Sequence, residues 1–148
     1  MERGETVVVF VGTHERALDD KGRLVLPAKF RIHFSLNGFV SPGPGCVALH
    51  TAEGFEEMTN RLTEQIKAGE MEPMAIRKAM AFTEEVRLDA QGRVTLSREL
   101  RDFASLEGEV VVCGFIDRIE IWNAERWADM ATELDRSVVD AFRLGGGI

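Results

Sequence analysis

Cysteine and histidine are scarce in this sequence of 148 residues, which contains two cysteines and three histidines. Cys46 and Cys113 fit neither a CxxC pair nor a zinc-ligand spacing, so we expect two buried thiols in a reducing compartment. His14, His33 and His50 share no metal-ligand spacing either, and surface or partly buried positions are their default. The sequence therefore predicts neither a disulfide framework nor a bound metal.

Long apolar runs and catalytic motifs are also missing. The only apolar stretch near the start, residues 6–11, is too short to cross a bilayer, and it lacks the basic segment and the cleavage site of a signal peptide. We therefore expect a cytoplasmic protein with no membrane partner. The chain has no GxSxG, no phosphate-binding loop and no Cys–His pairing, so we expect no enzyme, no catalytic residues and no cofactor.

Positive charge is outnumbered, because 18 lysines and arginines face 25 acidic residues and give a net charge of −7. This balance argues against nucleic-acid binding by bulk charge. The charge is nevertheless segregated along the chain. Residues 14–31 hold more basic than acidic side chains, whereas residues 53–72 are rich in glutamate. A local basic face therefore remains compatible with an acidic protein.

The main feature that is present is a repeat. Residues 18–31 and 88–101 match in register, with Leu, Asp, Gly, Arg, Leu and a final Arg recurring at an offset of seventy. Two copies are too few for a solenoid. We therefore predict an α+β fold built from a duplicated module whose two halves pack as one unit.

Each copy predicts a similar series of elements. In the first, a strand over residues 10–18 and a return strand over residues 23–26 flank a turn and form a hairpin with a basic tip, before a short helix that Pro27 opens. Two short strands then precede a helix that Thr51 caps and Gly69 ends, and Pro73 opens a second helix. The helix after Thr51 carries one apolar stripe: Phe55, Met58, Leu62 and Ile66.

The second copy repeats this order from residue 84 onwards. Ser97 replaces Pro27, which we expect to loosen the second short helix. Asn123 is predicted to cap one final helix before a flexible tail over residues 144–147. The stripe of this helix lies seventy-two residues after the first stripe: Trp127, Met130, Leu134 and Val138. Both stripes are predicted to be core, with a possible continuation into a subunit interface.

The two Asp-x-x-Gly-Arg turns contain the best candidates for a site. Turn chemistry alone selects aspartate and glycine, which predicts structural roles for Asp19, Gly22, Asp89 and Gly92. The arginines could pair with a carboxylate, but a guanidinium also suits phosphate oxygens and guanine edges. We favour DNA binding for Arg23 and Arg93.

Other basic residues are further DNA-binding candidates. Lys21 lies at the tip of the first turn, where the second copy has the less basic Gln91. Lys29 and Arg31 flank Phe30 on the short helix, where they are either solvated or reach the DNA backbone, and both alternatives stay open. Arg16 belongs to the same basic block. Arg87, Arg98 and Arg101 could act similarly in the second copy.

These motifs resemble the MraZ family. The first matching run covers residues 10–12 and 18–31, and the second combines residues 89–93 with residues 118–122. The resemblance implies two tandem SpoVT-AbrB domains, each an AbrB-like swapped-hairpin β-barrel module, that form a pseudo-dimer within one chain and are flanked by helices. It also implies a homo-oligomeric ring of roughly eight to twelve subunits, closed by repeated head-to-tail contacts.

The same resemblance implies a sequence-specific, nucleoid-associated DNA-binding repressor. Its DNA partner would be the direct repeats in the promoter of its own division and cell-wall gene cluster. An alternative is an antitoxin-like protein-interaction module of the same fold. The expected division of the chain is an extension over residues 1–9, a first SpoVT-AbrB domain over residues 10–56, a helical connector over residues 57–82, a second SpoVT-AbrB domain over residues 83–126, and a C-terminal helix and tail over residues 127–148.

Overall fold

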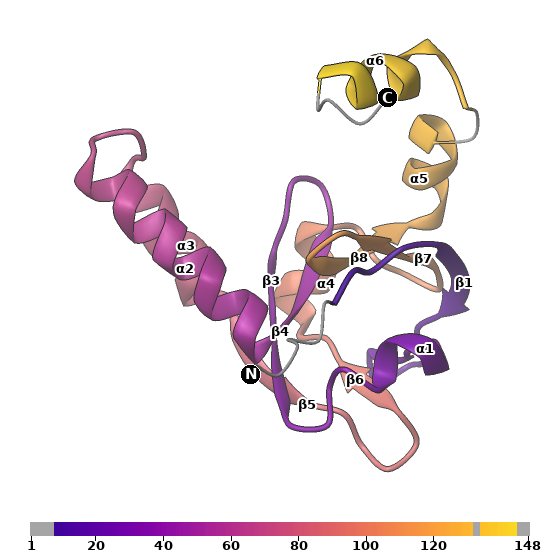
Figure 1. The fold of residues 1–148 in the computed structure, drawn as a ribbon. Helices are drawn as coiled ribbons and strands as arrows, with labels where there is room; N and C mark the ends of the chain where they lie inside the picture. Colours follow the sequence, from indigo (N-terminus) through magenta and orange to yellow (C-terminus); the bar gives the residue numbers. More distant parts are fainter. Residues whose placement is uncertain (1–7, 132–133, 145–148) are drawn as a thin grey trace, which may run out of the picture.

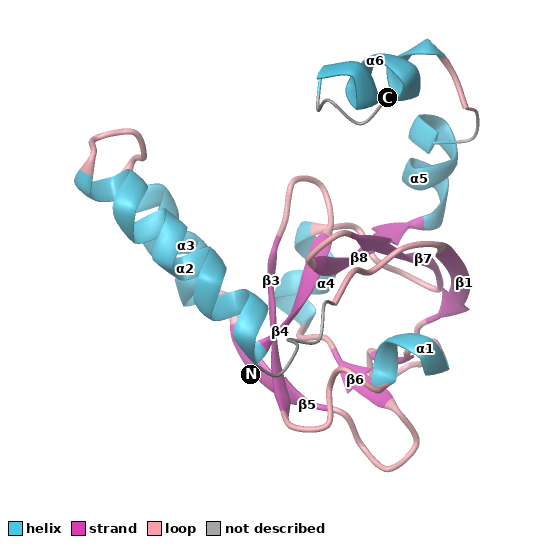
Figure 2. Cartoon of the chain, viewed as in Figure 1, coloured by secondary structure: helices cyan, strands magenta, loops and turns pink. Residues whose placement is uncertain are grey.

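The computed structural model describes residues 8–131 and 134–144, in which two helical arms project from a β-sheet body (Figure 1). The first repeat contains β1 (Thr13–Ala17), β2 (Arg23–Val25), α1 (Ala28–Arg31), β3 (Asn37–Pro42), β4 (Val47–Thr51), α2 (Ala52–Lys67) and α3 (Pro73–Ala81). The second contains β5 (Glu84–Arg87), β6 (Arg93–Thr95), α4 (Arg98–Phe103), β7 (Glu109–Phe115), β8 (Arg118–Asn123), α5 (Ala124–Ala131) and α6 (Arg136–Leu144). Figure 2 shows the resulting mixture of helices and strands.

Strands of both repeats contribute to each sheet. Within the described residues, a six-stranded sheet has the order β1-β7-β8-β4-β3-β5, and a second sheet pairs β2 with β6. Exchanging each strand for its counterpart in the other repeat reverses the order of the large sheet and leaves it otherwise unchanged. The two repeats are therefore related by a pseudo-two-fold axis, and the α+β fold with a duplicated module is confirmed.

The prediction that the two strands flanking each turn pair with one another in a hairpin is wrong. The first turn does close locally, because the amide of Gly22 donates to the carbonyl of Asp19 at 3.0 Å. The strands on either side of it then separate: β1 pairs with β7, and β2 pairs with β6. A three-residue return strand buries little apolar surface within its own repeat, and marginal two-stranded hairpins need further packing. Pairing with the other repeat supplies that packing.

The hydrophobic core is shared by the two repeats. Its members come from β2 and β6, from the short helices α1 and α4, and from the central strands of the large sheet. Among those with no exposed surface are Leu24, Leu26, Leu49, Val94, Ile119 and Ile121. Phe10 is buried as well and forms an isolated bridge with Ile116, whereas the strand expected from residue 10 begins only at Thr13. Among the described residues, both hydrophobic clusters combine side chains of the two repeats.

Most predicted helix signals are confirmed. The hydroxyl of Thr51 accepts from the amide of Gly54 at 3.0 Å, Gly69 has φ +77°, and Pro73 is the first residue of α3. The expected loosening at Ser97 is wrong. The Ser97 hydroxyl caps α4 by accepting from the amide of Leu100, and α4 has six residues where α1 has four. An N-terminal serine cap therefore compensates for the missing proline.

The prediction of a single final helix is also wrong, because α5 and α6 are separate helices. Asn123 caps α5 as expected, by accepting from the amide of Arg126 at 2.9 Å. The carboxylate of Asp135 then accepts from the amide of Ser137 at 2.9 Å, and a side-chain cap of this kind starts a new helix. Leu134 precedes α6, and the expected tail lies outside the described residues except for Leu144, which ends α6.

The helices that leave the body form the two arms in Figure 1, one of α2 and α3 and the other of α5 and α6. In the described ranges, no helix has the length and apolar character needed to cross a membrane. The expectation of buried thiols is confirmed, since Cys46 and Cys113 are both buried and free. Trp122 is buried beside Cys113 under α5, and its ring centroid lies 6.1 Å from that of Trp127.

Because β2 holds the repeats together, its two faces differ in their expected tolerance to truncation. Leu24→Ala removes a fully buried side chain and should lower the free energy of unfolding by about 2–5 kcal/mol. The neighbouring change Val25→Ala, at a side chain that is 38% exposed, should cost far less. Chemical denaturation of both variants measures this difference, and equal losses would contradict the inward orientation of Leu24.

Candidate nucleic-acid interface

The β2–β6 pair brings the two Asp-x-x-Gly-Arg turns to one short ribbon. In its register, Leu24 lies opposite Val94, and both side chains are buried. Side chains alternate across a strand, so the neighbours of these two point outward. The outer face consists of Arg23, Val25, Arg93 and Thr95, and we call it the basic ribbon. Arg23 pairs with Thr95 and Val25 with Arg93, which puts the arginines at diagonal corners.

Asp19 organises the first turn. One carboxylate oxygen accepts from the amides of Lys21 at 2.9 Å and Arg23 at 2.8 Å. The other accepts from Nε of Arg23 at 2.6 Å. The amide of Arg23, followed by its side chain and the amide of Lys21, lowers the pKa of Asp19 from 3.8 to about 2. The turn therefore holds a carboxylate that stays ionised and fixes one edge of the Arg23 guanidinium.

The second turn repeats this geometry. One oxygen of Asp89 accepts from the amides of Gln91 and Arg93, each at 2.9 Å, and the other accepts from Nε of Arg93 at 2.7 Å. The amide and side chain of Arg93 lower the pKa of Asp89 as well. Arg23 and Arg93 keep 29% and 26% of their side chains exposed. Each arginine thus pairs with a carboxylate, as a structural role requires. Each also faces solvent, as a DNA-binding role requires.

The turn glycines are covered by the opposite repeat. Gly22 and Gly92 both have φ +76°, which suits glycine. A Cβ on Gly22 would lie 2.7 Å from Nε of Arg101, and one on Gly92 would lie 2.6 Å from Nε of Arg31. Each glycine therefore serves both the turn and close packing, and the structural roles expected for these two residues follow from the geometry.

Arg31 and Arg101 consequently belong to the fold of the site. Nε of Arg31 donates to the carbonyl of Leu26 at 2.8 Å, and Nε of Arg101 donates to that of Leu96 at 3.1 Å. Both arginines are half-buried. Sequence reasoning missed this arrangement, although the recurrence of the final Arg in both copies was the signal. A residue that clamps the other repeat must be present twice under pseudo-two-fold symmetry.

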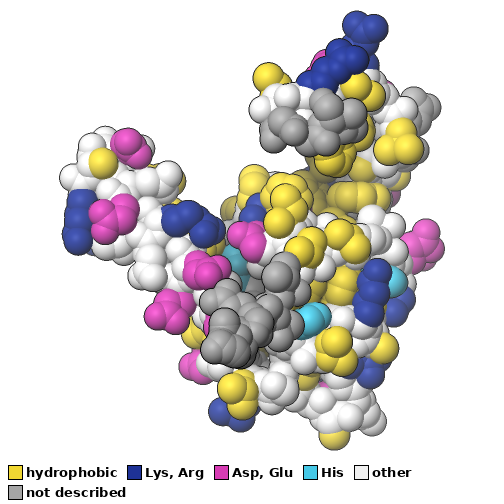
Figure 3. Space-filling view, in the orientation of Figure 1, with side chains coloured by type: hydrophobic (Ala, Val, Ile, Leu, Met, Phe, Trp, Pro, Cys, Tyr) yellow, Lys and Arg dark blue, Asp and Glu magenta, His cyan; other side chains and the backbone are white. Residues whose placement is uncertain are grey.

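The remaining basic candidates lie around the ribbon. Lys21 is exposed at the first turn. Lys29 places Nζ 5.5 Å from the centroid of the Phe30 ring, and His14 packs edge-on against the same ring. Burial, and then the charges of Lys29 and Arg16, lower the pKa of His14. Lys29 and Arg16 therefore both add positive charge near His14, in the region of β1 and α1 where Figure 3 shows lysine and arginine side chains.

Acidic side chains gather elsewhere. In Figure 3 several of them cover the α2–α3 arm and its base, away from α1. Within the described ranges, no group of three or more histidine, cysteine or acidic side chains could hold a metal ion. The arrangement at the ribbon thus offers oriented cations on the outer face of an antiparallel ribbon, which is chemistry for binding an anion.

Comparisons with known proteins agree with this duplicated architecture. The family described as "MraZ protein, putative antitoxin-like" matches residues 9–66 and 79–142. The chain belongs to the MraZ family. It is 40% identical over 134 residues to the transcriptional regulator MraZ of Saccharopolyspora erythraea, with 90% of this chain and 94% of that protein covered. It is 43% identical over 123 residues to the protein of that name from Mycolicibacterium vanbaalenii, with 82% and 85% covered.

The two segments that match MraZ correspond to the two structural repeats. Each includes one Asp-x-x-Gly-Arg turn, one short helix and one pair of sheet strands. The resemblance stated from the sequence motifs is therefore confirmed for the family. In this MraZ chain the ribbon is made jointly by the two matched segments, so the candidate interface exists only when both are folded together.

The Asp19 carboxylate predicts a pH dependence of stability. Its pKa is depressed in the folded protein, so its contribution is present above pH 4 and is lost as the pH falls towards 2. Asp19→Asn should therefore flatten the decline in unfolding midpoint over this range. Asp20→Asn, which removes the same charge from the exposed neighbouring residue, is the matched control. A decline in Asp19→Asn as steep as that of Asp20→Asn would contradict the prediction.

Proposed function

We propose that this MraZ family member is a sequence-specific DNA-binding transcriptional regulator, and that it represses its own division and cell-wall gene cluster. Relatives at about 40% identity carry the name transcriptional regulator. The observation that carries the proposal is the basic ribbon, where Arg23 and Arg93 lie on the outer face of one two-stranded element. A two-stranded ribbon fits the major groove of B-DNA.

The carboxylate under each arginine supports base reading. Asp19 and Asp89 hold Nε of the two arginines at 2.6 and 2.7 Å. A guanidinium fixed in this way has lost part of its rotational freedom before binding, so less entropy is lost when it contacts a guanine edge. We assign base contacts to Arg23 and Arg93 because they share one outward face and the same support. The glycines and aspartates of the turns act by holding that face.

Phosphate contacts are assigned to the surrounding lysines and Arg16. Lys21 is exposed beside Arg23, and Lys29 and Arg16 both add positive charge in the region of β1 and α1. Arg31 contributes first to the fold through the carbonyl of Leu26, and its remaining donors are placed towards the DNA backbone in this proposal. The acidic arm opposes non-specific contact with phosphates, so binding depends on local geometry.

A ring would multiply this interface. One small ribbon per subunit supplies modest affinity, while several ribbons on one rim bind successive direct repeats at a high effective concentration. We therefore retain a homo-oligomeric ring, repeats in the promoter DNA, and a cytoplasmic, nucleoid-associated protein as parts of the proposal. The boundaries 1–9, 10–56, 57–82, 83–126 and 127–148 also remain a proposal, with residues 1–7, 132–133 and 145–148 outside the described structure.

The first test is fluorescence anisotropy with the DNA upstream of the protein's own gene. Wild-type protein should bind it more tightly than a scrambled duplex, with an affinity that falls steeply as salt rises. Arg23→Ala and Arg93→Ala should each lose about 5- to 150-fold in affinity, since a bidentate base contact supplies about 1–3 kcal/mol of discrimination. Arg23→Lys, which keeps the charge without the fork, should fall between wild type and Arg23→Ala.

Lys67→Ala is the control, because it removes one positive charge from the exposed end of α2. Unfolding midpoints are measured for every variant, since Arg23 also pairs with Asp19. Wild-type binding by a folded Arg23→Ala would remove this residue from the interface. Equal affinity of the wild type for upstream and scrambled DNA would overturn the operator part of the proposal.

The role proposed for Lys21 can be tested separately, through the salt dependence of DNA affinity. As a phosphate contact it should weaken binding to all sequences alike, so Lys21→Ala should reduce the slope of log affinity against log salt by about one per engaged subunit. Gln91→Lys places the corresponding positive charge in the second turn and should make affinity fall more steeply with salt. A titration over several salt concentrations measures both, and an unchanged slope for Lys21→Ala would place this lysine away from phosphate.

A protein-interaction role is the second candidate. It is favoured by the antitoxin-like description of the family and by α6, whose side chains are all exposed. DNA binding by the purified protein alone separates the two functions, because an interaction module would need its partner present before any shift of the DNA.

A further inference from the structure

Equivalent helices in the two repeats differ in how well they are covered. The apolar stripe of α2 is half-buried at Met58, Leu62 and Ile66. The corresponding residues seventy-two positions later are exposed, with 57% of Met130 and 92% of Leu134 accessible. The repeat therefore encodes the same apolar stripe twice but covers it once within the chain.

The difference follows from the connections. After α2 the chain returns through α3 into β5, and β5 pairs with β3, the neighbour of β4 from which α2 starts. Both ends of the α2–α3 arm are thus tied to adjacent strands, which makes α3 run back along α2 (Figure 1). The second repeat has no such return among the described residues, since α6 follows α5 and projects away from the body.

The helix α6 also lacks support of its own. All nine of its residues are exposed, yet Val138, Val139 and Phe142 lie on one side at helical spacing. Isolated helices shorter than about 12–15 residues are marginal in water. An amphipathic helix of this length is expected to be ordered by packing its apolar side against another surface.

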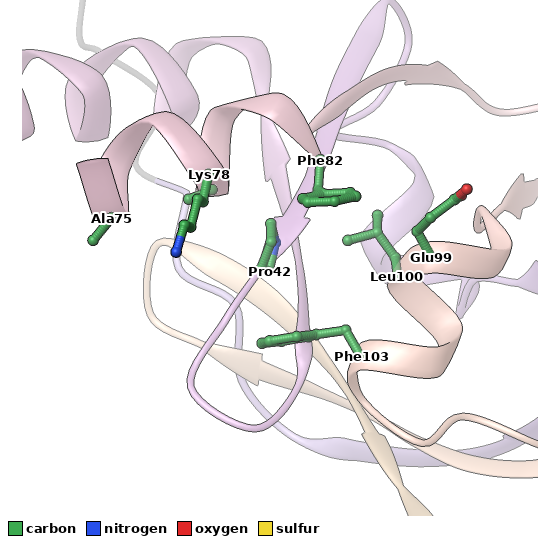
Figure 4. A pocket seen from close by; sticks show the side chains of 8 residues that line it. Pro42, Ala75, Lys78, Phe82, Glu99, Leu100 and Phe103 are labelled. Atoms are coloured by element: carbon green, nitrogen blue, oxygen red, sulfur yellow. The ribbon is translucent and has the colours of Figure 1, made fainter. Parts of the chain in front are cut away.

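A second apolar surface lies at the α2–α3 arm, on the side of α3 that faces α4. A groove of about 380 Å³ runs between α3 and α4, and its principal lining residues are Pro42, Lys78, Phe82, Glu99, Leu100 and Phe103. Figure 4 shows the rings of Phe82 and Phe103 and the side chains of Pro42 and Leu100 facing the same space. Phe82 and Phe103 are 50% and 53% exposed, so the groove presents an open apolar floor.

We propose that α6 of one copy of this chain packs into the α3–α4 groove of the next copy, and that this contact builds the oligomer. In this arrangement α3 covers α2 with one face and the α5–α6 stripe of a neighbour with the other. The inference rests on the ring in the proposed function and assigns its interface. The two surfaces differ, so the contact is head-to-tail, which closes into the ring of the proposed function when the rotation between neighbours completes a full turn.

Charge at the edges favours a second copy as the occupant. Arg143 follows Phe142 and borders the apolar side of α6, while Glu99 of α4 and Lys78 of α3 both line the groove, so only the α4 side of the groove is complementary to Arg143. An arginine and a glutamate at the rim of an apolar contact are complementary and fix the direction in which α6 lies. The groove and the exposed side of α6 are therefore both apolar, and Arg143 and Glu99 supply one pair of opposite charges at their edges.

The first test is the mass of the protein in solution without DNA, measured by light scattering after size-exclusion chromatography. Wild type should be an oligomer, while Phe142→Asp on α6 and Phe82→Asp in the groove should each reduce the mass to that of small species. Leu36→Asp, at another exposed apolar residue outside both surfaces, should leave the mass unchanged. A monomeric wild type, or full-size oligomers of both groove and helix variants, would overturn the inference.

Cross-linking tests the direction of the contact. A variant with Phe103→Cys and a differently tagged variant with Phe142→Cys are unfolded, mixed, refolded and treated with a short bis-maleimide. The heterodimeric product should form in the mixture, and neither variant alone should give a cross-linked dimer. The native Cys46 and Cys113 are buried and serve as internal controls in wild type. A cross-link in Phe142→Cys alone would instead indicate a symmetric α6–α6 contact and overturn the proposal.

Anisotropy with DNA containing one or several repeats separates this inference from the DNA-binding function. Phe142→Asp should keep wild-type affinity for a single repeat and lose the gain that wild type obtains from several. If the wild-type protein failed to bind a single repeat, the DNA-binding function would be refuted. The mass measurements would still decide whether α6 and the α3–α4 groove form the subunit interface. Retention of the multiple-repeat gain by a dissociated Phe142→Asp would overturn the role of α6 in the array.

Discussion

The pairing of β2 with β6 is the constraint on which the rest of the structure depends. It consists of three residue pairs, extended at each end by the amide of Leu26 donating to the carbonyl of Gly92 and the amide of Leu96 donating to that of Gly22. Each repeat is thereby closed by the other. The same pairing buries Leu24 against Val94 and turns both arginines outward, so the core and the candidate interface arise from one local arrangement.

This economy means that stability and the proposed DNA recognition share residues. Asp19 accepts two turn amides and also holds Arg23, while Arg31 covers Gly92 and binds the carbonyl of Leu26. A side chain in this region therefore has two roles in any mutational series. The carboxylate also offsets the charge of the arginine that it orients, which favours contacts that need the guanidinium fork over contacts that need charge alone.

Much of this was predictable from the sequence because turns and caps are local. The Asp-x-x-Gly-Arg spacing predicted both turns, and Thr51, Gly69 and Pro73 set helix ends through their own backbone chemistry. Strand pairing between repeats was not readable from spacing, because a strand as short as β2 carries no information about its partner. The break before α6 was missed because the apolar stripe continues across it, although Asp135 and Ser137 formed a recognisable cap.

Fusion of two repeats into one chain also permits the halves to differ. Gln91 stands in the second turn where the first has Lys21, and the apolar stripe that is half-buried on α2 is exposed at the corresponding positions of the second repeat. In a symmetric dimer of identical modules, every donor helix and every groove would occur twice and would favour closed pairs or branching. A fused chain that keeps one helix α6 and one α3–α4 groove can instead join neighbours in a single direction. If the proposed contact, ring and DNA function all hold, this asymmetry would let a pseudo-symmetric unit join its neighbours in one direction, so that every ribbon meets one of a row of direct repeats.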